Sequence, residues 1–157
     1  MMQALKKTIK TDEPQPLLSA LNDLRESIQY PHRKLLMNHD LTLPQWRVIL
    51  LLSKQNNVEI IELAKLTSLL QPSVSRILAA LLKRDLITRE ANENDLRRFQ
   101  ISLSKKGWAL FNEISPMAEG IFEQMNRLVG QQKVDELIQL LKEFNHVLTD
   151  EENNSDI

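Results

Sequence analysis

One segment of this chain has a different spacing of hydrophobic residues from the rest. Apolar residues recur every three or four positions before Leu82 and again after Phe111, which is the spacing of helices that bury one face. Between Ile87 and Leu103 they alternate with polar residues around a polar turn at 92–95, and this pattern predicts a β-hairpin. One hairpin in an otherwise helical chain of 157 residues predicts a mainly α fold, in one domain with helical extensions.

Prolines and polar breaks divide the helical parts of the chain. In chain order, the sequence predicts a flexible arm (1–13), an N-terminal helix that Pro31 ends or kinks (14–40), a unit of helices and the hairpin (41–104), C-terminal helices with a kink at Pro116 (105–149) and a frayed acidic tail (150–157). The central unit therefore lies between long helices from opposite ends of the chain.

The sequence predicts that two short helices in the central unit form a helix-turn-helix. The second helix is expected to begin with Pro72, a residue that suits the first turn of a helix. Its apolar residues nearest the crossing are Val74 and Ile77, and we expect them to face Leu63 and Leu66 of the first helix. Such a pair presents the start of its second helix to the major groove of DNA. The alternative is an ordinary αα-hairpin within a bundle.

The outer helices carry apolar stripes that each need a cover. These stripes are Leu17–Ile28, Phe111–Leu128 and Val134–Leu148. Long helices that flank a small domain bury such stripes well against a second copy related by a two-fold axis, so we predict a homodimer. The alternative is a monomeric bundle in which the terminal helices cover one another.

Basic residues are concentrated in one short segment. Residues 71–107 hold eight Lys or Arg and four Asp or Glu, a net charge of +4, whereas residues 108–157 have a net charge of -7. Clustering, rather than the total charge of -1, sets the field that a polyanion meets. A solvated surface is the ordinary explanation of such a run, so the charge needs support from the pattern.

Two groups of residues in this segment suit contacts with DNA. At the start of the second short helix, hydroxyl and guanidinium groups can bind phosphates or base edges. At the hairpin turn, arginines beside a carboxylate can enter a narrow minor groove. The candidate DNA-binding residues are Pro72, Ser73, Ser75, Arg76, Asp95, Arg97 and Arg98. The alternative for Asp95 and Arg97 is a surface ion pair.

The run from Asp95 to Gly107, DLRRFQISLSKKG, resembles the wing signature D-x-R-x-x-x-V-x-L-T-x-x-G of the MarR family of regulators. The outright matches are Asp95, Arg97, Leu103 and Gly107. The resemblance implies a winged helix-turn-helix with a β-hairpin wing, flanked by N- and C-terminal dimerisation helices. It also implies a homodimeric transcription factor, usually a repressor released by a small ligand, that binds palindromic double-stranded operator DNA. In that family pattern Arg97 enters the minor groove and the helix from Pro72 is the recognition helix.

A second similarity concerns the molecule that such a repressor senses. Leu41-Thr42 with Gln45-Trp46-Arg47, together with Leu70-Gln71-Pro72-Ser73, resembles the branch of the family that regulates aromatic-acid catabolism, such as homoprotocatechuate and hydroxycinnamate degradation. This implies a phenolic carboxylate or its thioester as effector, which needs a flat apolar wall and a cation. The candidate effector-binding residues are Tyr30, His32, Arg33, His39, Trp46 and Arg47. A core position for Trp46, and surface positions or ion pairs for the charged residues, are the alternatives.

Other functional classes lack the residues that they require. The chain has no cysteine, no H-E-x-x-H and no G-x-S-x-G, and its three histidines are scattered. We therefore expect no catalytic residue, no metal site and no cofactor. No apolar stretch approaches the roughly 20 residues of a membrane span, so we expect a cytoplasmic protein without membrane contact. The alternative function is a helical protein-interaction module that does not touch DNA.

Overall fold

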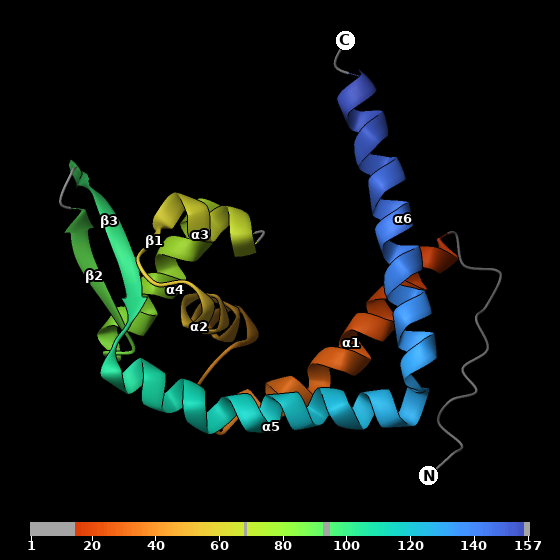
Figure 1. The fold of residues 1–157 in the computed structure, drawn as a ribbon, viewed down its shortest axis with the longest axis horizontal. Helices are drawn as coiled ribbons and strands as arrows, with labels where there is room; N and C mark the ends of the chain where they lie inside the picture. Colours follow the sequence, from red (N-terminus) through yellow and green to blue (C-terminus); the bar gives the residue numbers. More distant parts are fainter. Residues whose placement is uncertain (1–14, 68, 93–94, 156–157) are drawn as a thin grey trace. The chain divides into compact units, whose positions relative to one another are not determined.

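The computed structural model describes residues 15–67, 69–92 and 95–155, without the side chains of residues 92, 95–98 and 151–155. The predicted arm therefore lies outside the described residues. The elements, in chain order, are α1 (Pro16–Met37), α2 (Leu43–Lys54), β1 (Val58–Glu59), α3 (Ile60–Thr67), α4 (Gln71–Lys83), β2 (Ile87–Asn92), β3 (Asp95–Leu103), α5 (Lys105–Val129) and α6 (Gln131–Ser155) (Figure 1). The predicted mainly α fold with one hairpin is confirmed.

The chain forms two compact units, which divide within α5 after Pro116. In the first unit, α2, α3 and α4 pack beside a small sheet, with the hairpin of β2 and β3 at one side of the helices (Figure 1). The residues that fill this core are fully or almost fully buried: Val48, Ile49, Leu52, Val58, Leu63, Val74, Leu81, Leu86 and Ile101. Aliphatic side chains dominate, as the low aromatic content of the sequence requires.

The sheet has three antiparallel strands in the order β1-β3-β2. The alternation that predicted the hairpin is present, with Ile87 opposite Leu103 in the register. Strand β1 was not predicted, because its two residues are too few to show an alternating pattern. It adds Val58 opposite Ile101, both fully buried, and so fixes the start of α3 to the middle strand.

Local capping explains where α2 begins. The side chain of Thr42 accepts a hydrogen bond from the backbone N–H of Gln45, whose side chain accepts one in return from the backbone N–H of Thr42. This capping box, with a proline in the first turn, satisfies two of the N–H groups that a helix leaves unpaired at its start.

The packing of α3 on α4 confirms one part of the predicted contact and corrects another. Leu63 and Val74 are fully buried, and Ala64 is buried where it allows the helices to approach. Leu66, however, is 51% exposed, so the expectation that it faces α4 is wrong. The short helix buries only the face that carries Leu63 and Thr67.

Two helix ends lie beyond the expected positions, Pro31 and residue 150. Helix α1 continues through Pro31, because His32 and Leu36 are buried beyond it and their packing holds the last turns despite the missing N–H. Helix α5 contains Pro116, and the kink expected there stays a prediction. Helix α6 extends to Ser155 instead of fraying from residue 150. Across the predicted end, the ring Nδ1 of His146 lies 2.9 Å from Asp150 Oδ2, four residues apart.

Candidate nucleic-acid interface

Helix α4 presents one polar, small-residue face to solvent. Val74, Leu78 and Leu81 are buried on its inner side. On the outer side Pro72, Ser75 and Arg76 are exposed, while Ser73 is half-buried at the edge. A helix whose first two turns carry short side chains and one arginine can approach a groove closely, and it offers hydroxyl and guanidinium donors there. The structure therefore brings together the four helix residues that we predicted.

The turn before α4 is held from α2. Arg47 Nη1 donates a hydrogen bond of 3.2 Å to the carbonyl oxygen of Thr67, the last residue of α3. The Thr67 hydroxyl donates to the carbonyl oxygen of Leu63 at 2.6 Å within the same short helix. Arg47 thus satisfies a carbonyl at the end of a helix, which is a favoured place for a cation. We had predicted Arg47 as an effector residue, and this contact gives it a structural role as well.

The hairpin places the predicted wing residues on one strand. Asp95, Arg97 and Arg98 belong to the first half of β3, and Asn92 of β2 pairs with Asp95 across a register shift next to Ala91. The side chains of these residues lie outside the described part of the chain, so the predicted contact between Asp95 and Arg97 stays a prediction. The hairpin turn and α4 belong to the same unit, as the prediction requires.

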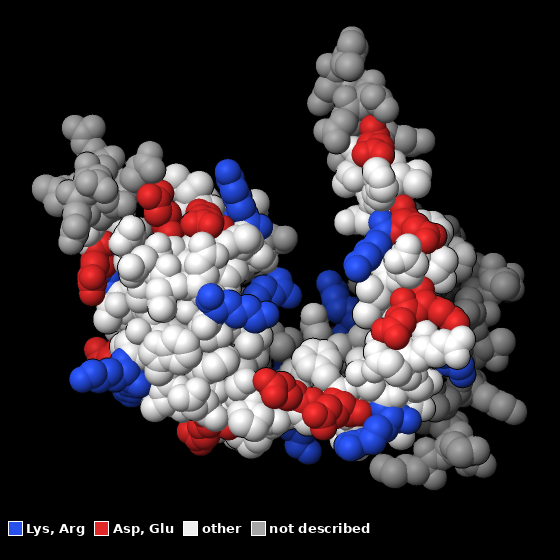
Figure 2. Space-filling model, in the orientation of Figure 1, with Lys and Arg blue, Asp and Glu red and all other residues white. Residues whose placement is uncertain are grey.

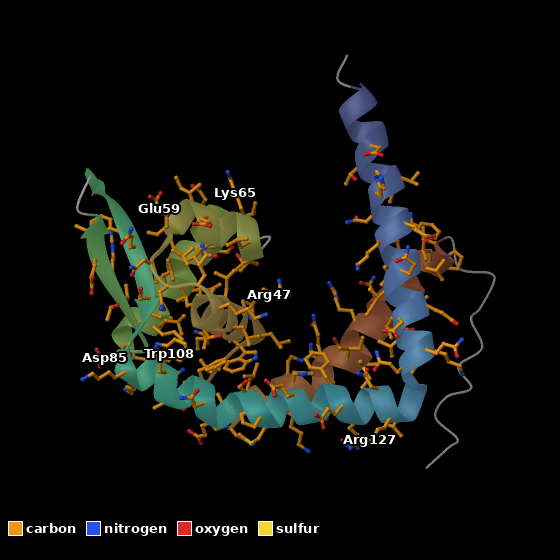
Figure 3. The ribbon with its side chains drawn as sticks, viewed as in Figure 1. Arg47, Glu59, Lys65, Asp85, Trp108 and Arg127 are labelled. Carbon is orange, nitrogen blue, oxygen red and sulfur yellow. The ribbon has the colours of Figure 1, made fainter. Side chains whose placement is uncertain are left out.

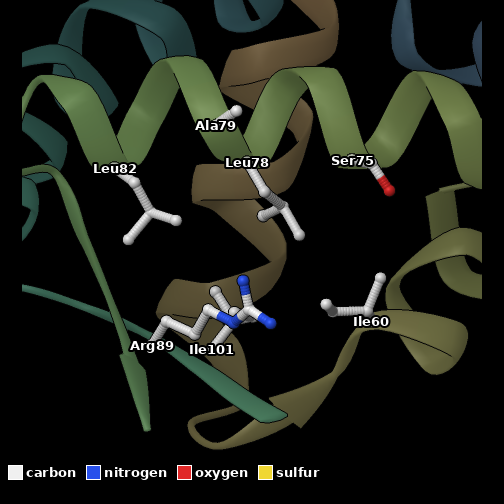
Figure 4. Close-up of a pocket in the computed structure, with 7 residues that line it drawn as sticks. All are labelled: Ile60, Ser75, Leu78, Ala79, Leu82, Arg89 and Ile101. Atoms are coloured by element: carbon white, nitrogen blue, oxygen red, sulfur yellow. The ribbon is translucent and has the colours of Figure 1, made fainter.

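A pocket of about 230 Å³ lies between α4 and the hairpin (Figure 4). Ser75 and Arg89 are the polar residues of its lining, which comprises Ile60, Ser75, Leu78, Ala79, Leu82, Arg89 and Ile101. The guanidinium carbon of Arg89 lies 3.6 Å from the centroid of the Phe99 ring. This cation–π contact joins β2 to β3 in the middle of the hairpin and places a positive charge between the hairpin and α4.

Basic side chains also mark the helix side of this unit. Figure 2 shows Lys and Arg over the region of α2 and α3, where Figure 3 labels Arg47 and Lys65. Glu59 lies on the hairpin side of α3 in the same view (Figure 3). These basic residues lie outside segment 71–107, so the charge segregation along the sequence stays a prediction.

The far end of α4 is anchored to two other elements. Arg84 Nη1 and Nη2 donate to the carbonyl oxygens of Asp40 and His39, at 2.5 and 2.9 Å, in the turn between α1 and α2. Lys106 Nζ, at the start of α5, donates to the carbonyl oxygen of Arg84 at 2.8 Å. Sequence reasoning missed this role of Arg84, because its partners lie more than 40 residues away and are backbone atoms.

The candidate effector residues of α1 are only partly accessible. Tyr30 is exposed, whereas His32 is buried and its ring Nδ1 lies 3.0 Å from the carbonyl oxygen of Ile28. Arg33 pairs with Glu26 through both guanidinium nitrogens, with Nη1 donating to Oε2 at 3.1 Å. The predicted cation thus already has a carboxylate partner within the same helix.

This ion pair changes the titration of both groups. Its hydrogen bonds hold the pKa of the Glu26 carboxyl below its usual value and raise the pKa of the Arg33 guanidinium. A lowered carboxyl pKa means that the pair is fully charged at neutral pH and is lost only as the pH falls through that lowered value. An anionic ligand must therefore compete with Glu26 at neutral pH.

The other candidate effector residues lie near the start of α5. Trp46 is 4% exposed, and its ring stacks on Phe111 with centroids 5.9 Å apart, so it belongs to the core. The ring Nδ1 of His39 lies 3.7 Å from Glu113 Oε1. In Figure 3, Asp85 and Trp108 mark the junction of the hairpin base and α5. Trp46 thus has a core position and His39 a neighbouring carboxylate, and the effector role of the predicted residues stays a prediction.

Two kinds of site are missing from the described part of the chain. No group of three His, Asp or Glu side chains is placed to hold a metal ion there. Among the described helices, none combines the length and the apolar character needed to cross a membrane.

Comparison with known proteins identifies the family. The profile of the MarR family matches residues 41–99, which include α2, the helix-turn-helix and most of the hairpin. The homoprotocatechuate degradative operon repressor of Escherichia coli is 32% identical over 82% of this chain and 86% of its own length. The chain belongs to the MarR family. As relatives named as repressors and transcriptional regulators indicate, this MarR protein is a transcriptional regulator and not an enzyme.

Solved MarR-type structures extend the match to most of the chain. The transcriptional regulator PA4135 is 32% identical, with a TM-score of 0.74, and the match covers 83% of this chain and 96% of that one. NadR in complex with 4-hydroxyphenylacetate is 30% identical, with a TM-score of 0.68, over 80% and 89% of the two chains. The hairpin of β2 and β3 is thus the wing, and α4 is the second helix of the MarR winged helix-turn-helix.

Proposed function

We propose that this MarR protein is a repressor that binds a palindromic operator as a homodimer and is released by a phenolic acid. The observation that carries DNA binding is the exposed face of α4, where Pro72, Ser75 and Arg76 lie outward while Val74 and Leu78 are buried. These three residues are exposed to solvent, and the wing lies in the same unit. A recognition helix and a wing then read adjoining grooves.

Exposed apolar side chains on the C-terminal helix support the homodimer. Leu137, Leu141, Phe144 and Leu148 follow a spacing of four, three and four on α6, and they are 38–61% exposed. This is the spacing of helices that pack along a shared seam. A second copy is the proposed cover, since an isologous contact buries the same stripe from both protomers.

The first test concerns the wing. Replacing Arg97 with alanine is expected to weaken specific operator binding by about 1–3 kcal/mol, because the minor-groove contact of each wing is lost. Fluorescence anisotropy with an operator duplex measures the change, and the salt dependence of binding shows how many phosphate contacts remain. The matched control is Arg127→Ala on α5, outside the central unit, which is expected to leave affinity unchanged. Equal affinities for Arg97→Ala and wild type would refute insertion of the wing.

The proposed effector follows from two relatives. The Escherichia coli relative is named for homoprotocatechuate degradation, and NadR was solved with 4-hydroxyphenylacetate. Homoprotocatechuate and 4-hydroxyphenylacetate are both phenolic carboxylates, the class of effector that the sequence resemblance implies. In this chain Arg33 is the cation proposed to bind the carboxylate, in exchange for Glu26. For release, the acid must bind the conformation that DNA rejects more tightly than the one that DNA selects.

The pair Arg33 and Glu26 allows two variants with opposite effects. Arg33→Ala is expected to raise the concentration of 4-hydroxyphenylacetate needed for half-release about tenfold, without loss of operator binding, because the charged contact is removed. Glu26→Gln is expected to lower that concentration, because the competing carboxylate is gone. An operator-shift titration measures both, and a thermal-shift titration measures binding to the free protein. If neither variant changes the response, Arg33 is not the carboxylate contact.

A further inference from the structure

Leu70 occupies a position where neither helix capping nor core packing explains a leucine. It is the N-cap residue of α4, and its side chain makes no capping hydrogen bond, although Ser, Thr, Asp and Asn are preferred there. Its side chain is 78% exposed, the highest value among the large apolar side chains described within residues 15–116. The departure from the N-cap preference without a packing gain leaves an apolar side chain available for a contact outside the chain.

The neighbouring surface of α4 indicates the chemistry of that contact. Pro72, Ser75 and Ala79 are exposed along α4 after Leu70, and their small size allows the helix to approach a groove closely. Arg76 is the single charged residue between positions 70 and 79, and Leu70 is the one large apolar side chain exposed there. The edges of base pairs carry one apolar group in the major groove, the C5-methyl group of thymine.

We propose that Leu70 packs on the C5-methyl group of a thymine and thereby selects thymine at one position of each operator half-site. The inference rests on the proposed function and specifies one base of the operator that the protein recognises. The start of a recognition helix contacts base edges, whereas the first helix of the motif crosses the DNA backbone. Leu70 directly precedes the first residue of α4, so it lies on the base-reading side of the motif.

The test removes one methyl group at a time from the DNA. The full-length protein first selects a duplex from a random-sequence pool, and each thymine of the selected half-site is then replaced by deoxyuridine in both half-sites. One of these replacements is expected to weaken wild-type binding about fourfold per half-site, and so about 15-fold for the palindrome, because burial of one methyl group is lost. With Leu70→Ala, the same replacement is expected to change affinity less than about twofold.

Leu66→Ala is the matched control for the protein. It makes the same substitution at another exposed leucine, 51% exposed on α3, which we do not place at the bases. This variant is expected to keep the full penalty for deoxyuridine. Since Leu70 is exposed and makes no cap, both variants are expected to melt like the wild type. The scan on the wild-type protein tests the proposal even if a variant fails to fold.

Two outcomes overturn the proposal and leave operator binding intact. One is tight wild-type binding with no sensitive thymine. The other is a Leu70→Ala variant that loses the same factor on the thymine and deoxyuridine duplexes. If Leu70→Ala binds DNA normally but loses a partner protein, Leu70 belongs to a protein interface instead. Failure to select any duplex contradicts the proposed function itself, and is thus distinct from failure of the thymine contact.

Discussion

Phe144→Glu on α6 is expected to convert the protein to a monomer and to weaken operator binding by about 10²–10⁴-fold. Phe144 is 58% exposed in the middle of the apolar stripe of α6, so two copies that share this seam would bury two glutamates against each other. A monomer binds each half-site independently and loses the effective concentration that the paired protomer provides. Light scattering after size-exclusion chromatography measures the mass, and anisotropy measures the affinity.

A second charge on the same helix provides the control. Gln139→Glu also adds one negative charge to α6, but its position is on the opposite side of the helix, where Gln139 hydrogen-bonds only to Glu143. This variant is expected to remain a dimer and to bind the operator like the wild type. If Phe144→Glu also stays dimeric with normal affinity, the stripe of α6 is not the contact between protomers.

Gly107→Ala is expected to destabilise the protein by about 3 kcal/mol, because there is no room for a methyl group. A Cβ at Gly107 would lie 1.9 Å from the carbonyl oxygen of Leu86, which is a backbone atom and cannot rotate away. That carbonyl also accepts a hydrogen bond of 3.1 Å from the N–H of Ser104. The hairpin base and the first turn of α5 must therefore separate. The fall in Tm is expected to be about 10 °C, measured by calorimetry.

Gly120→Ala on the same helix separates the clash from the general effect of alanine. No atom lies within 4 Å of a Cβ built at Gly120. Alanine is favoured over glycine in a helix by about 1 kcal/mol, so this variant is expected to be as stable as the wild type or slightly more stable. The expected changes in stability for Gly107→Ala and Gly120→Ala have opposite signs, so the loss at Gly107 can be assigned to the clash with Leu86. Equal stability of Gly107→Ala and wild type would show that the backbone at Leu86 can move to accommodate the methyl group with little loss of stability.

Patterns that repeat along the chain predicted most of the fold. The alternation between Ile87 and Leu103 predicted the hairpin, and Pro72 predicted the start of α4 within one residue. Single residues were less predictable. The exposed Leu66 satisfies the same spacing as a buried leucine, and the two residues of β1 have no period at all. Burial at such positions depends on partners from elsewhere in the chain.

In the candidate site, too, the pattern of an element was predictable and the partners of single residues were not. The residues of α4 were predictable because a helix start in a basic segment has a known use. The partners of Arg33 and Arg84 were not predictable, since one is a carboxylate two turns away and the others are carbonyl oxygens more than 40 residues away. Composition and spacing carry no information about backbone acceptors. Those contacts follow from tertiary packing alone.

Arg84 fixes the C-terminal end of α4 to the turn between α1 and α2. A tilt of α4 about this end would move its N-terminal end most. The 13 residues of α4 correspond to a length of about 20 Å at 1.5 Å per residue. A tilt of about 5° about the C-terminal end displaces the opposite end by about 1.7 Å, which exceeds the tolerance of a hydrogen bond. We therefore expect a small shift of the turn that contains His39 and Asp40 to produce a larger shift at the end of α4 that carries Leu70.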